Sequence, residues 1–228
     1  MEGLILGIDL CDDYSQISCF SSRMTEPEPV YYQPEDENKK ENVLIPMVVC
    51  KKKGKDEWLI GEEACRTALF NDGTTVDKLV KMIHDDKFAT IEGVRYSAGE
   101  LMRRYLEKLL RLPKEKYGTD EICSVVFTVQ TLDGRFIDCL VRTAEECGID
   151  RSAVHVVSHT ESFVYHTISQ KKEVWANLTS LFDLTDEGLH YYEMKVIRGC
   201  VPQMIEASHE KMQEGFRLDV LDNPNGAR

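Results

Sequence analysis

Residues 4–20 read LILGIDLCDDYSQISCF, and residues 178–197 read LTSLFDLTDEGLHYYEMKVI. Each stretch holds an aspartate with an apolar residue on both sides, Asp9 in the first and Asp183 in the second. Small or acidic residues follow, and then a second β-prone run, which predicts a strand, a tight loop and a returning strand. Two such hairpins, near opposite ends of the chain, indicate a duplicated architecture in which both loops face one cleft.

Composition narrows the class of protein. The 228 residues are enough for one large domain or two small ones, and 42% hydrophobic with 30% charged residues is ordinary for a globular protein. The net charge of −12 argues against a surface for nucleic acid or anionic membrane. The start, MEGLILGIDL, lacks both a basic leader and a spanning apolar run. We therefore expect a soluble cytoplasmic protein.

The eight cysteines are scattered, and no CxxC pair occurs. We interpret them as reduced thiols of the core, because the ligand spacing of a zinc site is absent. Three histidines near Cys147 (His155, His159 and His166) raise the alternative of a metal or thiol site. The favoured interpretation is that they are ordinary histidines at helix edges.

The first half of the chain is predicted to contain a second group of strands and two clear helices. Residues 24–42 are rich in Pro, Glu and Asn and predict a loop, followed by strands at 43–50 and 58–60. A helix is predicted over residues 62–70. Another begins at Ser97, where Ser97 and Glu100 form a capping box, and is expected to end at Pro113.

The second half alternates strands and helices. The apolar run 122–129 predicts a buried strand, and a helix follows at 134–147 with Gly148 after its end. A strand at 154–157 and a helix at 161–169 come next. This succession predicts parallel strands with right-handed crossovers, and with the hairpins it gives a mixed α/β sheet flanked by helices. A further strand is predicted at 201–207.

Five segments in chain order resemble the nucleotide-binding domain of DnaK-type chaperones, in the superfamily of sugar kinase, heat-shock chaperone and actin ATPases. GIDLCDDYS and SLFDLTDEGLHYYEMKV are similar to its two phosphate loops, and the resemblance covers almost the whole chain. A bacterial family of unknown function with a chaperone-like ATPase fold would show the same pattern. The five segments are residues 7–15, 45–64, 125–149, 154–168 and 180–196.

The resemblance implies a fold and a domain division. It implies a ribonuclease H-like actin/chaperone ATPase lobe at residues 1–175, with a mixed five-stranded sheet flanked by helices and an insert at about 62–118. Residues 176–228 would begin a second, similar lobe that is incomplete in this chain.

The resemblance also implies roles for individual residues. Asp9 and Asp183 would orient metal-bound water, Glu161 would be the catalytic glutamate of the cleft, and the catalytic lysine would be Lys78 or Lys81, with Lys78 preferred. The alternative for both aspartates is that they cap tight β-turns, a common use of Asp. The residues that would contact the nucleotide phosphates are Asp12, Asp13, Tyr14, Thr185, Asp186 and Gly188.

Both loops depart from the family pattern. Cys11, Asp12 and Asp13 replace Gly-Thr-Thr, and residues 185–187 stand where three glycines would be. At an effective dielectric of ~20, two like charges ~4 Å apart repel by about 4 kcal/mol. Several such pairs against a triphosphate would cancel most of a micromolar affinity, about 8 kcal/mol. A divalent metal ion could offset this repulsion, since clustered carboxylates attract hard cations.

These features leave two principal hypotheses. The favoured one is a degenerate, non-hydrolysing nucleotide-binding fold that acts through protein–protein interaction. The alternative is an active Mg-ATP-dependent ATPase completed by a second lobe, and a sugar kinase is disfavoured because no sugar-binding constellation is visible. Two possibilities for the cofactor are equally open: ATP or ADP with Mg, or no cofactor at all. We expect an unidentified protein partner and neither nucleic acid nor membrane, with the oligomeric state left open.

Overall fold

The computed structural model describes residues 3–31, 43–119, 121–171, 178–185, 188–197 and 203–214. The chain divides into two compact units, Met1–Val156 and Val157–Arg228, and each is described by itself. The boundary that the sequence predicts, between residues 175 and 176, lies outside the described residues.

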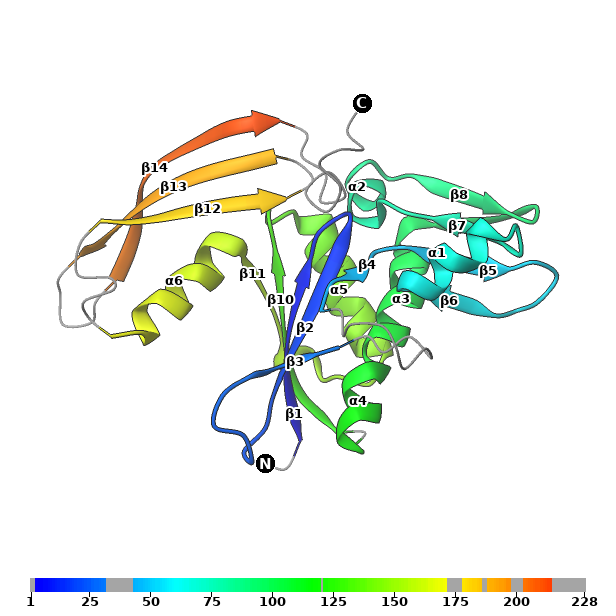
Figure 1. Cartoon of the computed structure of the whole chain (residues 1–228), viewed down its shortest axis with the longest axis horizontal. Coiled ribbons are helices and arrows are strands. Elements are labelled where there is room, and N and C mark those ends of the chain that lie inside the picture. The colour runs from blue at the N-terminus through cyan, green and yellow to red at the C-terminus, as the bar shows by residue number, and fades with distance from the viewer. Residues whose placement is uncertain are drawn as a thin grey trace. The chain divides into compact units, whose positions relative to one another are not determined.

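The largest sheet among the described residues is mixed and has six strands, one more than the five that the resemblance implies (Figure 1). Its order is β11-β10-β1-β2-β3, and the short β4 pairs with β2. β1 runs parallel to β10 and antiparallel to β2, so the predicted mixed sheet is confirmed. The strands are β1 (Leu4–Leu10), β2 (Tyr14–Phe20), β3 (Glu28–Val30), β4 (Ile45–Pro46), β10 (Ile122–Val129) and β11 (Val154–Ser158).

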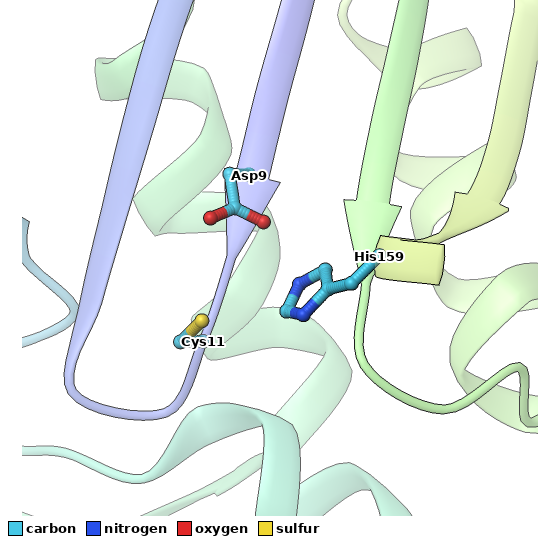
Figure 2. A group of neighbouring side chains, drawn as sticks. All are labelled: Asp9, Cys11 and His159. Carbon is cyan, nitrogen blue, oxygen red and sulfur yellow. The ribbon is translucent and has the colours of Figure 1, made fainter. Parts of the chain in front are cut away.

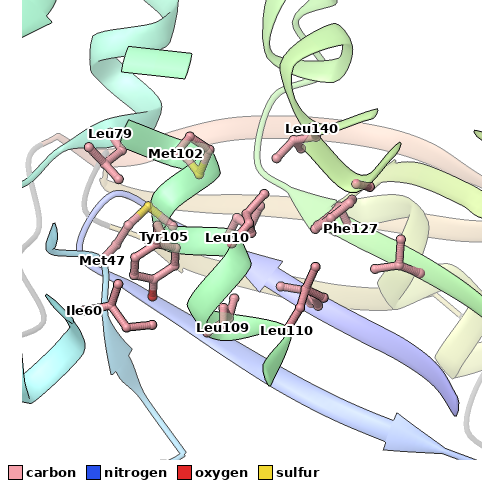
Figure 3. Packing of buried hydrophobic residues seen from close by; sticks show 14 of the residues in the cluster. Leu10, Met47, Ile60, Leu79, Met102, Tyr105, Leu109, Leu110, Phe127 and Leu140 are labelled. Atoms are coloured by element: carbon pink, nitrogen blue, oxygen red, sulfur yellow. The ribbon is translucent and has the colours of Figure 1, made fainter. Parts of the chain in front are cut away.

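The core lies on one face of this sheet, because β1 alternates strictly. Leu4, Leu6, Ile8 and Leu10 are buried, whereas Asp9 belongs to the opposite face. Helices α3 (Ala98–Leu109) and α5 (Gly134–Glu146) contribute to the same cluster of buried side chains (Figure 3). Asp9 is therefore presented by a rigid strand on the side away from the core.

Helix α3 confirms the predicted capping box. Ser97 accepts a hydrogen bond from the Glu100 N–H, and the Glu100 carboxylate accepts one from the Ser97 N–H. The predicted stop at Pro113 is wrong. α3 ends at Leu109, and Pro113 lies inside the next helix, α4 (Arg111–Tyr117). Proline is tolerated there because the first helical turn needs no intrahelical N–H donor.

The predicted strand 43–50 is divided between two sheets. Its first part is β4, and its second part belongs to a small sheet of order β6-β5-β7. The division follows Pro46, which cannot donate a ladder hydrogen bond, and the Met47 N–H donates to the Asp13 carbonyl instead (2.9 Å). The strands of the small sheet are β5 (Val49–Lys52), β6 (Trp58–Ile60) and β7 (Gly73–Val76).

Two short helices and a second hairpin complete the first unit. The predicted helix 62–70 is confirmed as α1, and a second short helix, α2, follows it in the chain. An antiparallel hairpin, β8–β9, precedes α3. These elements are α1 (Gly61–Leu69), α2 (Leu79–His84), β8 (Phe88–Ile91) and β9 (Val94–Ser97), and the 3₁₀ turn η1 (Arg151–Ala153) precedes β11.

The second unit contains helix α6 (His159–Ser169) and a three-stranded antiparallel sheet. The predicted second hairpin is confirmed as β12 (Thr179–Thr185) and β13 (Gly188–Ile197). β14 (Gln203–Glu214) pairs with β13 and is longer than the predicted strand 201–207. α6 begins two residues earlier than predicted, because the Ser158 side chain caps it by accepting the Glu161 N–H.

None of the seven described cysteines forms a disulfide, and Cys200 lies outside the described residues. The predicted core position holds for Cys19, Cys50 and Cys139, which are buried, whereas the other four are half-buried. Burial raises the pKa of the Cys19 thiol to about 11 and also raises the pKa of Cys139 and Cys147. A raised pKa lowers the thiolate fraction, so these thiols are poor nucleophiles. Within the described part of the chain, no helix is long and apolar enough to cross a membrane.

Candidate functional site

Asp9 is positioned by the strand beside its own hairpin. It is the second-last residue of β1 and lies in register with Thr128 of β10. The Thr128 hydroxyl donates a hydrogen bond of 2.8 Å to the Asp9 carboxylate. Figure 2 shows Asp9 near the end of its strand and Cys11 in the loop that follows. The carboxylate is thus held at the loop mouth, where the sequence predicts it.

The loop between β1 and β2 is a tight turn, and its first acid, Asp12, is buried and hydrogen-bonds within the protein. The Cys11 N–H donates to the Tyr14 carbonyl (3.0 Å), and Asp12 is only 6% exposed. The Asp12 carboxylate accepts the N–H of Lys81, in the first turn of α2, at 3.0 Å. The residue before this helix, Lys78, provides no side-chain cap. Asp12 therefore caps α2 from a distant loop.

The second acid of the loop binds the lysine proposed as catalytic. Lys78 forms an ion pair with the Asp13 carboxylate, and the side chains of Asp13 and Lys78 are 15% and 34% exposed. Lys78 itself adopts a left-handed backbone (φ 55°) immediately before α2. Asp12 and Asp13 thus hold the beginning of one helix by two different contacts. The Lys78 ammonium, which the resemblance would place against a phosphate, is instead paired with a carboxylate of the same protein.

The first hairpin is also held in place by contacts of the first two residues of β2. Tyr14 is the first residue of β2 and pairs with Pro46 of β4. The next residue, Ser15, shares a buried hydrogen bond of 2.6 Å with the Tyr105 hydroxyl, which also donates to the Ile45 carbonyl at 3.3 Å. Tyr14, which the resemblance expects to contact phosphate, is therefore a residue of β2 that pairs with β4 and precedes the buried Ser15 hydroxyl in the chain.

Asp183 has a different kind of partner. Both of its carboxylate oxygens lie within hydrogen-bond distance of His159 Nδ1, at 3.0 and 3.2 Å, and each side chain is 12% exposed. His159 is the first residue of α6 (Figure 2). The pair therefore connects the helix to β12. Its partners lie 24 residues apart in the chain, and no motif in the sequence connects them.

Glu161 lies in the first turn of α6. Its N–H donates to the Ser158 hydroxyl (3.1 Å), and its carboxylate accepts a hydrogen bond from the Tyr165 hydroxyl (3.2 Å). Both contacts are local to the helix and to its cap.

The second loop is shorter than the first. Thr185 and Gly188 are paired in register, so residues 186–187 alone connect β12 to β13. Thr185 is buried at 4% exposure, and Gly188 has φ 139°, a backbone conformation that favours glycine. The predicted contact of Asp186 lies outside the described residues. Thr185 and Gly188 act here as the closing pair of a hairpin.

The predicted residues thus form two groups in two different units. Asp12 and Asp13, which closely follow Asp9 in the chain, come together with Lys78 around the start of α2. In the second unit Asp183 meets His159, which the sequence favours as a helix-edge histidine, with a metal or thiol site as the alternative.

Comparison with known proteins gives one family. Residues 31–227 match a family described as the C-terminal part of a family of unknown function, DUF5716. The match covers most of the chain, so the chain belongs to this family. No curated protein matches it.

Proposed function

We propose that this member of DUF5716 carries a degenerate nucleotide-binding fold that does not hydrolyse ATP and works by binding another protein. The proposed fold is the ribonuclease H-like lobe of the actin and heat-shock chaperone ATPases. One observation carries the proposal. The two acids of the first loop are bound inside the protein, Asp13 by the Lys78 ammonium and Asp12 by the first turn of α2.

The arrangement of strands supports the proposed fold. The antiparallel hairpin β1–β2 lies against the parallel strand β10, and α5 and β11 follow in the chain. This is the succession that the resemblance implies. The retained position of Asp9, at the mouth of the first loop with Thr128 beside it, also agrees with it.

Electrostatics support the loss of hydrolysis. A nucleotide phosphate at this loop would have to displace Asp13 from Lys78 and would then face the carboxylates of Asp12 and Asp13. Each repulsion at ~4 Å is about 4 kcal/mol at an effective dielectric of ~20, and a micromolar affinity is only about 8 kcal/mol. Two such terms remove the binding energy on which catalysis would depend.

Exposed apolar side chains support a role in protein binding. Leu69 and Phe70, at the end of α1, are 81% and 69% exposed. In the second unit, Phe182 is 60% exposed and its ring centroid lies 5.0 Å from that of Tyr191. Clustered apolar groups on a surface are typical of protein–protein contacts.

A hydrolysis assay tests the proposal. We expect phosphate release from Mg-ATP to equal the buffer background for the wild-type chain and for Asp9→Asn alike. A matched control is Asp150→Asn, because the Asp150 carboxylate accepts hydrogen bonds from Ser152 in its own turn, away from the first loop. Hydrolysis by wild type and Asp150→Asn that disappears in Asp9→Asn would instead favour the active Mg-ATP-dependent ATPase.

A further inference from the structure

Two histidines meet on one face of the three-stranded sheet. His190 of β13 lies opposite Lys211 of β14, and the next residue on that face of β13, Tyr192, lies opposite His209. Residues that oppose one another in a ladder project to the same side of the sheet. His190 and His209 are therefore diagonal neighbours on adjacent strands.

Their imidazole rings are in direct contact through nitrogen. His190 Nδ1 and His209 Nε2 are 2.9 Å apart, and the ring planes differ by 23° with centroids 5.2 Å apart. The Tyr192 ring stacks on His209 at 4.3 Å and 11°. Tyr192 is only 7% exposed. The stacking therefore fixes the orientation of the more exposed histidine.

We propose that His190 and His209 form a two-histidine binding site for a divalent transition metal ion of the zinc, nickel or copper class. Imidazole nitrogen is a preferred ligand of these ions, with bonds of about 2.0–2.1 Å. Two such ligands in a tetrahedral site lie about 3.3 Å apart, slightly farther than the observed nitrogens. For both rings to bind one ion, the two facing nitrogens move slightly apart, and the ring that donates its N–H transfers that proton to its other nitrogen. His190 Nδ1 and His209 Nε2 then each direct a lone pair at the ion.

The surroundings suit a partly open site. His209 is exposed, so an ion can reach the pair from solvent, and water would complete its coordination. His190 is opposed by Asp183 on β12, whose carboxylate is bound to His159, and by the Lys211 ammonium on β14. These opposite charges flank His190 on its two neighbouring strands. The Asp183 carboxylate favours a bound cation, and the Lys211 ammonium opposes it.

This site is separate from the loop contacts on which the proposed function rests. It involves neither the first loop nor α2, and it requires no nucleotide. A failure of the metal site would leave the proposed function unchanged, and active hydrolysis would leave the metal site unchanged.

Titration of the chelator-treated full chain with Zn²⁺ tests the proposal. We expect saturable binding by wild type that is weaker by about tenfold or more in His209→Ala and in His190→Gln. Matched controls are His155→Ala and His166→Ala, because both of these histidines are exposed and outside the pair. The controls should bind Zn²⁺ as the wild type does. Equal affinity in all five proteins, or no saturable binding by wild type, would overturn the proposal.

A spectroscopic measurement that begins with the wild-type chain guards against misfolded variants. With one equivalent of Cu²⁺, electron paramagnetic resonance should show splitting from two imidazole nitrogens, one from each histidine. Replacement of the exposed His209 should reduce this to one nitrogen. A wild-type spectrum without nitrogen splitting would overturn the assignment, and so would a spectrum unchanged in His209→Ala.

Discussion

The two Asp-bearing hairpins look alike in sequence, yet the structure uses them differently. In the first, Asp9 contacts a hydroxyl on the parallel strand β10, and the three-residue loop after it holds helix α2. In the second, Asp183 contacts His159 of a helix, and two residues alone close the hairpin. The aspartate of each hairpin is therefore positioned by whichever element packs beside its strand. Similar hairpins do not guarantee similar sites.

The largest expected difference between the hairpins concerns buried hydroxyl groups. Tyr105→Phe should lower the free energy of unfolding by about 1–3 kcal/mol, because Ser15 and the Ile45 carbonyl lose a buried partner. Tyr191→Phe is the counterpart in the second hairpin, where the hydroxyl donates to Glu193 at a half-buried position. Its cost should be within about 0.5 kcal/mol. Urea unfolding of both variants measures the contrast, and equal losses would contradict it.

The two acids of the first loop should differ from each other. Asp12→Ala removes the cap of α2 and should cost about 1 kcal/mol, since capping side chains contribute on that scale. Asp13→Ala removes a partly exposed ion pair and should cost less, between about 0 and 1 kcal/mol. Thermal unfolding monitored by circular dichroism ranks the variants. A larger loss for Asp13→Ala would show that the ion pair, rather than the cap, holds α2.

The smallest expected effect on stability concerns the glutamates in the first turns of α3 and α6, one in each unit. Hydrogen bonds from the Ser97 N–H and hydroxyl lower the pKa of Glu100, so this carboxylate stabilises the folded state above the pKa of an unfolded glutamate, about 4.3. That contribution is lost as the pH falls through the lower folded pKa. Glu100→Gln should therefore be less stable than wild type at pH 7, by less than about 1 kcal/mol, and the difference should vanish in acid.

The counterpart in the second unit is Glu161→Gln. The Glu161 carboxylate contacts Tyr165 and does not reach back to the Ser158 N–H in any hydrogen bond that the described residues show. Urea unfolding at pH 7 should give a smaller loss than for Glu100→Gln. If the Glu100→Gln difference persists well below pH 4, the capping carboxylate is not its source.

Much of the fold could be predicted from sequence, because its signals are local. Alternating burial along β1, the apolar run of β10 and the Ser97 capping box are each contained within a few residues. The predicted helix end at Pro113 was wrong, because proline is excluded from helix interiors but is tolerated in the first turn of a helix, where Pro113 lies. The division of β4 from β5 depends on a contact with the first loop, which local pattern does not show.

The site was less predictable, because its contacts are distant in sequence. Asp13 and Lys78 are separated by 65 positions, and Asp12 reaches an N–H that is 69 positions away. The sequence indicates that acids replace small residues in the loop, and it favours Lys78 as the cleft lysine. It does not show that these acids bind the lysine and the helix that follows it. Such pairings arise from packing, and a single sequence carries no signal for them.

The most direct test of the central claim is calorimetric titration of Mg-ATP into the wild-type chain and Asp13→Asn. The account holds that the Asp13 carboxylate occupies Lys78 in place of a phosphate. It predicts no saturable heat for wild type, and tighter binding for Asp13→Asn than for wild type, because that change frees the lysine and removes a repelling charge. Micromolar binding by wild type that Asp13→Asn does not improve would contradict it.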